Sequence, residues 1–304
     1  MLLIEPERGA KRMIKHRTWL FVPGNHSRTM EKAMETQADI VIYDLEDAIP
    51  WNEKDEAREI VVKHLQEKHV NKASYKLLRV NESTSSFFTK DVIAGVRGNV
   101  DGIVLPKSEY PEHIKDVDQQ LTALEQELNC TVGDIPLFPL IESAIGVHNS
   151  YEIAKASPRI PRLSFGAIDY TSDIQTKLSD SGEELLYAQS QLVNSSYAAG
   201  IEGPIDTVYA DFQNEEGLLR DTQRGERLGF KGKMIIHPKQ IEPVHNVYTP
   251  SKKEVAKAAE IVNAYQRAQE RGDGAIQLNG KMIDVPVVKS AQQTLDLDKA
   301  LKET

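Results

Sequence analysis

Two acidic residues, Glu142 and Asp169, have the type and spacing expected of a site for a hard divalent cation. They lie 27 residues apart (169 − 142), about one strand plus one helix, and no His or Cys flanks either of them. Mg²⁺ is usually held by one or two protein carboxylates, and water and substrate oxygens complete its octahedron. A 2-oxo or 2-hydroxy acid could chelate such an ion, which would stabilise an enolate as a Lewis acid. The alternative is that one carboxylate caps a helix or pairs with an arginine.

A second acidic group, Asp44-Leu45-Glu46-Asp47, follows an apolar run, and Arg79 closes the next one. A guanidinium grips a carboxylate through two parallel hydrogen bonds, so Arg79 is a natural partner for an anion. We interpret Glu46 and Asp47 as groups that orient Arg79 or water on the cation. The alternatives are an acid cluster at a helix N-terminus and, for Arg79, a salt bridge at the rim of a barrel.

Eight short apolar runs, separated by amphipathic stretches, must position these residues. Near-continuous apolar runs are typical of parallel strands buried on both faces. The runs are Thr18–Val22, Asp39–Tyr43, Tyr75–Val80, Gly102–Leu105, Leu137–Ile141, Arg162–Phe165, Ile205–Val208 and Met234–Ile236. Eight strands, each followed by room for a helix, predict an α/β fold of the TIM (β/α)8 barrel type. An open doubly wound sheet is the alternative, but no glycine-rich phosphate loop follows the first strand.

Active sites of such barrels lie at the carboxyl ends of the strands. The two acidic groups and Arg79 all fall at predicted strand ends. Three more polar residues lie at or near such ends: Lys107, Asp206 and His237. We expect His237, which precedes a proline, to have a structural role.

The chain beyond residue 248 is longer than one barrel needs. Ser251 and Glu254 have the spacing of a capping box, which predicts the start of a helix. That helix should end before Gly272-Asp273-Gly274, with a hairpin over Ala275–Pro286 and a terminal helix over Lys289–Lys302. We therefore predict a TIM-barrel catalytic domain over residues 1–248 and a C-terminal extension over 249–304 that packs on a neighbouring subunit.

Composition narrows the class of partner. Of 304 residues, 37 are Lys or Arg and 46 are Asp or Glu, a net charge of −9 that disfavours nucleic acid. The single cysteine, Cys130, excludes an internal disulfide and a Cys-based zinc site. Met1–Arg17 lacks the apolar core of a signal peptide, and no apolar run is long enough to cross a bilayer. We expect a cytoplasmic protein with no membrane partner.

Several segments together resemble the citrate lyase β-subunit-like family, within the wider HpcH/HpaI aldolase group. Singly most are weak motifs, but they occur in family order from Arg17 to Ile241. They are Arg17-Thr18-Trp19-Leu20-Phe21-Val22-Pro23-Gly24, Asp44-Leu45-Glu46-Asp47, Glu53-Lys54-Asp55 with Ala57-Arg58, Arg79-Val80-Asn81, Leu105-Pro106-Lys107, Ile141-Glu142-Ser143-Ala144 with Gly146, Phe165-Gly166-Ala167 with Asp169-Tyr170, and Ile236-His237-Pro238 with Gln240-Ile241.

The resemblance implies a TIM barrel, a homotrimer or hexamer, Mg²⁺, and carbon–carbon cleavage or formation on an acyl thioester of CoA or of an acyl carrier. By position it makes Glu142 and Asp169 the metal ligands and lets Arg79 grip the substrate carboxylate. Glu46 and Asp47 form the acidic pair beside Arg79. The backbone at Phe21, Gly166 and Ala167 lines the substrate, and residues 237–240 lie towards the CoA arm.

The tail carries a second resemblance. Gly280-Lys281-Met282-Ile283-Asp284-Val285-Pro286 resembles the C-terminal arm of malyl-CoA lyases and malate-synthase-like proteins, whose aspartate reaches a neighbouring subunit's site. Asp284 would act there on the thioester, as a base or in hydrolysis. The shorter citrate lyase β-subunits lack this arm, so Asp284 favours a stand-alone CoA enzyme. His26 departs from the pattern, since some malyl-CoA lyases have an arginine there.

We therefore expect a Mg²⁺-dependent lyase or synthase that acts on a 3-hydroxy-acyl-CoA such as malyl-, methylmalyl- or citryl-CoA, with a small oxo or hydroxy acid as the second ligand. Three alternatives stay open. One is a citrate lyase β-subunit acting on an acyl-carrier thioester within a complex. Another is an aldolase for free 2-oxo acids that does not use CoA. The third is a non-catalytic subunit that keeps the site.

Overall fold

The computed structural model describes residues 16–67, 75–270, 272 and 274–302. Most of Met1–Arg17, and Asp273 of the predicted helix break, therefore lie outside the described residues. The chain divides into two compact units, Met1–His245 and Asn246–Thr304, and the division falls inside the helix that precedes residue 249.

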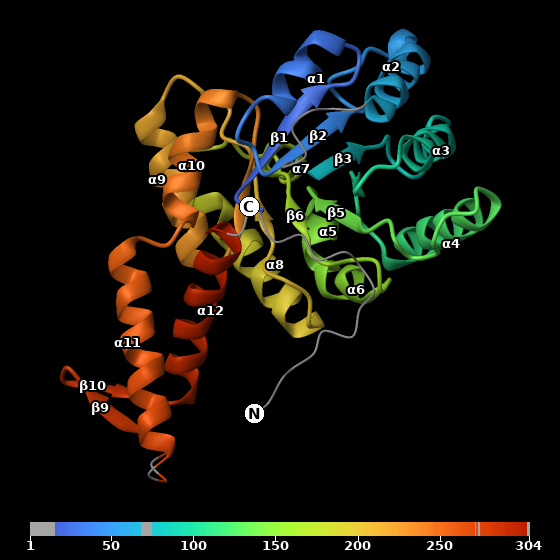
Figure 1. The fold of residues 1–304 in the computed structure, drawn as a ribbon. Helices are drawn as coiled ribbons and strands as arrows, with labels where there is room; N and C mark the ends of the chain where they lie inside the picture. Colours follow the sequence, from blue (N-terminus) through green and yellow to red (C-terminus); the bar gives the residue numbers. More distant parts are fainter. Residues whose placement is uncertain (1–15, 68–74, 271, 273, 303–304) are drawn as a thin grey trace. The chain divides into compact units, whose positions relative to one another are not determined.

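Eight parallel strands of the first unit close into a barrel in chain order, so the predicted TIM-type fold is confirmed (Figure 1). The closing contact pairs the first strand with the eighth, Trp19 beside Met234. The strands are β1 (Thr18–Pro23), β2 (Ile40–Asp44), β3 (Tyr75–Arg79), β4 (Gly102–Leu105), β5 (Leu137–Ile141), β6 (Ser164–Phe165), β7 (Ile205–Asp206) and β8 (Gly232–Ile235).

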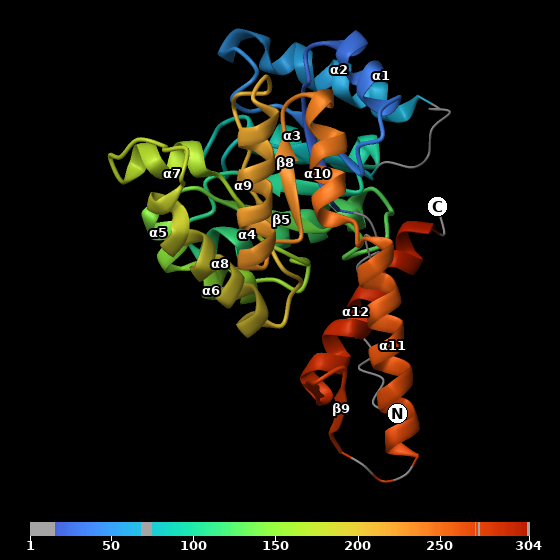
Figure 2. The same ribbon diagram turned by 90° about the vertical axis from the view of Figure 1, so that its left-hand side faces the viewer.

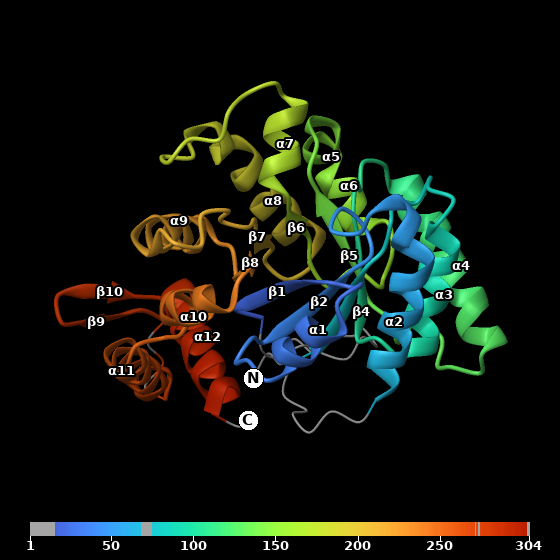
Figure 3. The ribbon, with the colours of Figure 1, turned by 90° about the horizontal axis from the view of Figure 1, so that it is seen from above.

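Helices follow the strands and cover the outside of the barrel, as α2, α3 and α4 show in the view from above (Figure 3). They are α1 (Ser27–Met34), η1 (Trp51–Glu53), α2 (Lys54–Gln66), α3 (Phe88–Gly98), α4 (Pro111–Glu127), α5 (Ala144–His148), α6 (Ser150–Lys155), α7 (Ala167–Asp173), η2 (Glu183–Leu185), α8 (Leu186–Ala199), α9 (Glu215–Leu228), η3 (Pro238–Gln240) and α10 (Ile241–Tyr248).

The interior of the barrel is a packed apolar core. Trp19 meets Phe138 edge to face, with ring centroids 5.0 Å apart. Side chains alternate along a strand, so positions two residues apart face the same way. Ile42 and Leu77 belong to this core, and the next positions of the same facing towards the carboxyl ends are Asp44 and Arg79. Side chains that face the barrel interior are therefore apolar within the core and polar at the carboxyl ends of β2 and β3.

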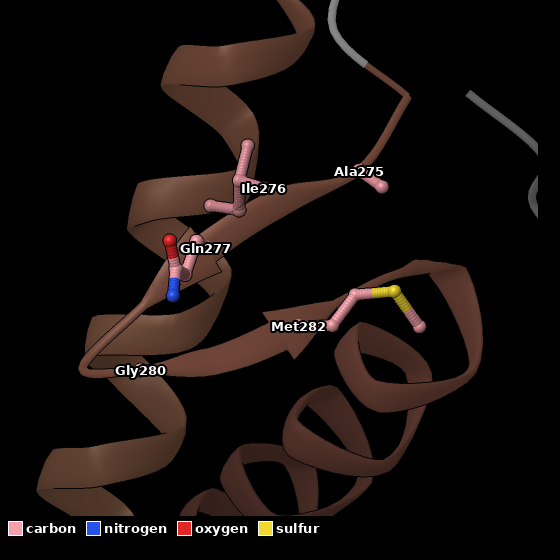
Figure 4. Close-up of a pocket in the computed structure, with 5 residues that line it drawn as sticks. All are labelled: Ala275, Ile276, Gln277, Gly280 and Met282. Atoms are coloured by element: carbon pink, nitrogen blue, oxygen red, sulfur yellow. The ribbon is translucent and has the colours of Figure 1, made fainter.

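The second unit contains two long helices and a hairpin. Ser251 and Glu254 form the predicted capping box, and α11 (Lys252–Gln269) packs along α12 (Val285–Lys302), side by side in Figure 2. Strands β9 (Ile276–Leu278) and β10 (Lys281–Ile283) pair antiparallel, with Met282 exposed on the hairpin (Figure 4). Ile283 is buried against α11 residues such as Ile261 and Tyr265, which gives this unit a core of its own.

Candidate active site

Arg79 stands at the centre of the polar end of the barrel. Its Nε and one terminal nitrogen donate to the two carboxylate oxygens of Asp44 at 2.7 and 2.6 Å. The other terminal nitrogen lies 2.9 Å from Glu46 and 3.6 Å from Asp47. The guanidinium carbon lies 4.9 Å from the centre of the Phe21 ring. Each nitrogen of the buried guanidinium therefore faces an acid of the β2 segment, and one of them is shared between two acids.

The β2 strand ends at Asp44, and the chain then turns. The Asp44 carboxylate accepts hydrogen bonds from the backbone N–H groups of Glu46 and Ala48, at 2.9 and 3.1 Å. This short polar turn replaces the strand continuation that would have made Asp44 and Glu46 face the same way. The turn buries Glu46 and leaves the Asp47 side chain 61% exposed.

Glu46 is a buried carboxyl group held by ion pairs. Its two oxygens lie 2.9 Å from Arg79 and 3.3 Å from the ammonium of Lys107. Within the described parts of the chain, neither oxygen accepts a hydrogen bond of good geometry. Burial raises the pKa of Glu46 to about 7; Arg79 opposes this shift and the charge of Asp47 adds to it. The group is therefore poised to gain or lose a proton near neutral pH.

Glu142 follows β5 and is also buried. One of its oxygens accepts a hydrogen bond of 2.7 Å from the backbone N–H of Lys107. Burial raises the pKa of Glu142 to about 8, and the charges of Glu46 and Asp169 add to the shift. A buried carboxyl group that has acidic neighbours and, among the described residues, one hydrogen-bond donor favours a cation, which would compensate its charge.

Asp169 and Gly166 complete this side of the site. Gly166 precedes α7, and Asp169 is an exposed residue in the first turn of that helix. A Cβ at Gly166 would lie 2.7 Å from Glu142 Oε2, so a glycine is needed for the close approach. The N–H of Ala167 donates to Thr207 at 2.9 Å, so this amide is already used. The charge of Asp169 raises the pKa of Glu142, so the two predicted ligands are close enough to interact electrostatically.

The donor set fits a hard cation with few protein ligands. Among the described residues, no group of three or more His, Cys, Asp or Glu side chains could hold a metal ion. Two carboxylates, Glu142 and Asp169, suit Mg²⁺, which keeps several water or substrate oxygens.

No helix in the described ranges is long and apolar enough to cross a membrane.

Two polar residues from the strand ends, Asp206 and His237, do not join this site. Asp206 is fully buried, receives a hydrogen bond from Gln189 on α8 and pairs with Lys233 at 3.4 Å. His237 caps η3, where its Nδ1 accepts the N–H of Lys239, in agreement with its expected structural role. Asp284 lies in the second unit, where its carboxylate accepts the N–H of Val287 at the start of α12.

The sequence placed Lys107 at a strand end but indicated no role for it in the site. Its backbone has a φ of 48°, and this conformation allows its N–H to reach Glu142 while its ammonium lies near Glu46. A glycine would have signalled such a backbone, but a lysine does not.

Comparison with known proteins now identifies the family. Residues 17–238 match the family described as HpcH/HpaI aldolase/citrate lyase. The chain belongs to this family. Residues 183–300 also match the description of a C–C bond lyase of the TIM-barrel fold, so the HpcH/HpaI resemblance and a carbon–carbon lyase activity are confirmed.

Similar proteins of this family include two classes of lyase. The citrate lyase subunit beta of Leuconostoc mesenteroides subsp. cremoris is 39% identical over 93% of either chain. The mitochondrial citramalyl-CoA lyase of Homo sapiens is 33% identical over 95% of this chain and 87% of its own. A crystal structure of CitE from Mycobacterium tuberculosis, in complex with magnesium, acetoacetate and coenzyme A, has a TM-score of 0.76 at 24% identity, and covers 95% of this chain and all of the other.

The C-terminal unit does not by itself separate the two classes. The match to the citrate lyase β-subunit omits 7% of 304 residues, about 21, whereas Asn246–Thr304 comprises 59. The match therefore extends well into the second unit. The match does not locate the arm at residues 280–286, so the expectation that the shorter β-subunits lack that arm stays a prediction.

Proposed function

We propose that this HpcH/HpaI family member cleaves or forms the carbon–carbon bond of a 3-hydroxy-acyl-CoA thioester that carries a carboxylate, of the malyl-, methylmalyl- or citryl-CoA type, with Mg²⁺. The observation that carries the proposal is the buried arrangement of Arg79, Glu46 and Glu142 at the carboxyl ends of the strands. The similarity to citramalyl-CoA lyase supports a CoA thioester as substrate.

Glu142 and Asp169 would hold the cation. Glu142 has one carboxylate oxygen fixed by the Lys107 N–H and the other close to Gly166. When bound, Mg²⁺ would polarise the oxygens of a 2-oxo or 2-hydroxy acid. The magnesium in the related CitE crystal structure is consistent with this assignment.

Arg79 would bind the carboxylate of the substrate. One edge of its guanidinium is already held by Asp44, so the substrate would meet the nitrogen that now faces Glu46 and Asp47. The Phe21 ring and the backbone of Gly166 and Ala167 would line the acid beside it. A fixed guanidinium orients a carboxylate without further ordering cost.

The reaction needs one group that can exchange protons. In the cleavage direction a base removes the proton of the 3-hydroxyl group, the carbon–carbon bond breaks, and the electron pair moves into the thioester enolate. The enolate then takes a proton on carbon, which yields a 2-oxo acid and a shorter acyl thioester. Glu46, with a pKa of about 7, suits the first proton transfer at neutral pH. In the reverse direction Asp284, from a neighbouring subunit, would remove the α-proton of the acyl thioester.

A second candidate is a citrate lyase β-subunit that acts on an acyl-carrier thioester within a complex. The 39% identity to such a subunit, higher than the 33% to citramalyl-CoA lyase, favours it. Both candidates share the site described above and differ in the thiol that carries the acyl group.

The test is an assay of the isolated chain with matched thioesters. Malyl-, citramalyl- and citryl-CoA are compared with the same acyl groups on an acyl carrier protein, with Mg²⁺ or with EDTA, and the released 2-oxo acid is quantified. The proposal expects turnover of at least one CoA thioester that EDTA abolishes. Turnover of the carrier thioesters alone would instead indicate the β-subunit function. Cleavage of free hydroxy acids without any thioester would indicate an aldolase, and no turnover with any of them a non-catalytic subunit.

A further inference from the structure

The turn that carries Glu46 is held by an ammonium group from α2. Lys54, the first residue of α2, is buried, and its Nζ donates to the backbone carbonyls of Leu45 and Glu46, each at 2.9 Å. The side-chain amide of Asn81 donates to the same Leu45 carbonyl at 3.0 Å. The two peptide groups that flank Glu46 are therefore both held: the first by Lys54 and Asn81, the second by Lys54.

Further polar groups hold Asn81 in place. Asp91 of α3, fully buried, accepts the backbone N–H and the side-chain amide of Asn81 at 2.9 and 2.6 Å. Its other oxygen accepts the Nε of Arg58 at 2.9 Å. Arg58 lies four residues after Lys54 on α2. Helix α2 is therefore bonded to the segment after β2 directly through Lys54, and α3 is bonded to it through Asp91 and Asn81.

An aromatic ring lies close to the buried Lys54 ammonium. Its Nζ lies 5.8 Å from the centre of the Phe87 ring, and Trp51 packs against Phe87 with ring centroids 4.5 Å apart. Hydrogen bonds from a shielded ammonium are stronger than the same bonds in water, because the surrounding dielectric is low. The bonds from Lys54 therefore hold the backbone of the turn more firmly than bonds from a solvent-exposed lysine would.

We propose that Lys54 is a positioning residue for the reaction and acts through Glu46. The inference rests on the proposed role of Glu46 in proton transfer. The Glu46 carboxylate has ion pairs but no well-formed hydrogen bonds among the described residues, so its place relative to Arg79 and Lys107 depends on where its backbone lies. Lys54 fixes that backbone without touching the substrate. Its positive charge also offsets the acids Asp44, Glu46 and Asp47 gathered in the turn.

The test replaces Lys54 by methionine, which keeps the length of the side chain and removes the ammonium. We expect kcat to fall roughly 10- to 100-fold, in line with other residues that orient a catalytic group, while KM for the thioester stays within about twofold. Lys90→Met is the matched control, because Lys90 is 59% exposed and its ion pair among the described residues is with exposed Asp55, at 3.2 Å. It should retain wild-type kcat and KM.

The decisive comparison is made in a Glu46→Gln background. If Lys54 acts through Glu46, Lys54→Met should not lower kcat further in that background. An equal loss of kcat with and without Glu46, or a wild-type kcat for Lys54→Met, would overturn the inference. Asn81→Ala, which removes the second donor to Leu45, should show the same dependence on Glu46 and replaces Lys54→Met if that variant does not fold. Wild-type activity of Glu46→Gln alone would instead refute the proposed role of Glu46.

Discussion

The carboxyl groups of Glu46 and Glu142 are both buried at the carboxyl ends of the strands, and the charge of Glu46 raises the pKa of Glu142. Lys107 connects them, since its ammonium lies near Glu46 and its N–H is bonded to Glu142. Because the pKa values of both acids are raised, a bound cation would change how far each acid is ionised, and hence the charge of the site.

Binding of Mg²⁺ should therefore depend on pH. Glu142, with a pKa of about 8 in the metal-free protein, must lose its proton to bind the cation. We expect the apparent affinity to rise up to about tenfold per pH unit between pH 6 and 8 and to level off above pH 8. Calorimetric titrations in two buffers with different ionisation enthalpies would measure the affinity and the protons released.

Two variants control this measurement. Glu142→Gln should lose Mg²⁺ binding and Mg²⁺-dependent turnover, and Asp169→Asn should do the same, with the fold intact by circular dichroism. Glu82→Gln removes a half-exposed acid that also lies near Lys107, at 3.8 Å, and should keep the wild-type affinity and pH dependence. Unchanged Mg²⁺-dependent activity in either ligand variant would disprove the metal assignment.

The stability of the metal-free protein should reveal the burial of Glu46. Its folded-state pKa of about 7 exceeds the ordinary value of 4.5, so the folded protein holds this proton more tightly than the unfolded chain. The contribution to stability is complete below pH 4.5 and is lost as the pH rises through 7. Glu46→Gln should gain up to about 3 kcal/mol relative to wild type between pH 5 and pH 8. Urea unfolding in EDTA at both pH values measures this difference, and a larger gain at pH 5 would contradict it.

Gly166→Ala should disturb the site through contact alone. The added Cβ would lie 2.7 Å from Glu142 Oε2 and from Glu142 Cβ, so the carboxylate must move. We expect about a 100-fold loss of kcat, the order of effect that a displacement of about 1 Å can have. Gly274→Ala is the control, because a Cβ there would meet no atom of the described residues within 4 Å. Steady-state kinetics of both variants, with Mg²⁺ varied, measure the effect; equal kinetics would show that Glu142 can shift without loss.

Arg79→Met should affect both stability and catalysis. It leaves Asp44 and Glu46 without their buried cation, which typically costs about 3–5 kcal/mol. Arg79→Lys keeps the charge but not the paired hydrogen bonds, so it should fold better and still raise KM. Arg159→Met is a matched control, since Arg159 is also buried and pairs with Asp118 and Glu125. It should lower the melting temperature without changing KM; an unchanged KM in Arg79→Lys would contradict carboxylate binding.

The barrel was predictable because buried parallel strands leave a strong pattern. The predicted ranges of β4 and β5 agree with the structure, and the capping box at Ser251 marks the start of α11. The sixth strand was predicted from Arg162, but only Ser164–Phe165 pair as a strand. Arg162 is fully buried behind it, with its guanidinium bonded to Glu202 and to the Gly203 carbonyl. The sequence shows that Arg162 adjoins an apolar run, but it does not show that its side chain bonds a loop carbonyl. The start of the strand was therefore predicted two residues too early.

Only those site residues that lie at strand ends or in family motifs could be predicted from the sequence. Arg79 and Asp44 were placed at strand ends, and the structure brings them together across neighbouring strands. The paired role of Lys107 depends on a left-handed backbone at a lysine, and that of Lys54 on two carbonyl contacts. Both are three-dimensional properties of ordinary residue types, so no sequence pattern announces them.

Asp284 offers the final prediction, because its chemical and structural roles can be separated. Its carboxylate accepts the N–H of Val287 at the start of α12, a bond that an asparagine can also accept. Asp284→Asn should therefore keep the melting temperature, whereas condensation or thioester hydrolysis should fall sharply. If the residue serves a neighbouring subunit, mixed oligomers of Asp284→Asn and Glu142→Gln should regain part of the activity. Oligomers of Asp284→Asn mixed with the double variant should regain none. No recovery in the first mixture, with subunit exchange verified by mass spectrometry, would show that Asp284 does not act on a neighbour's site.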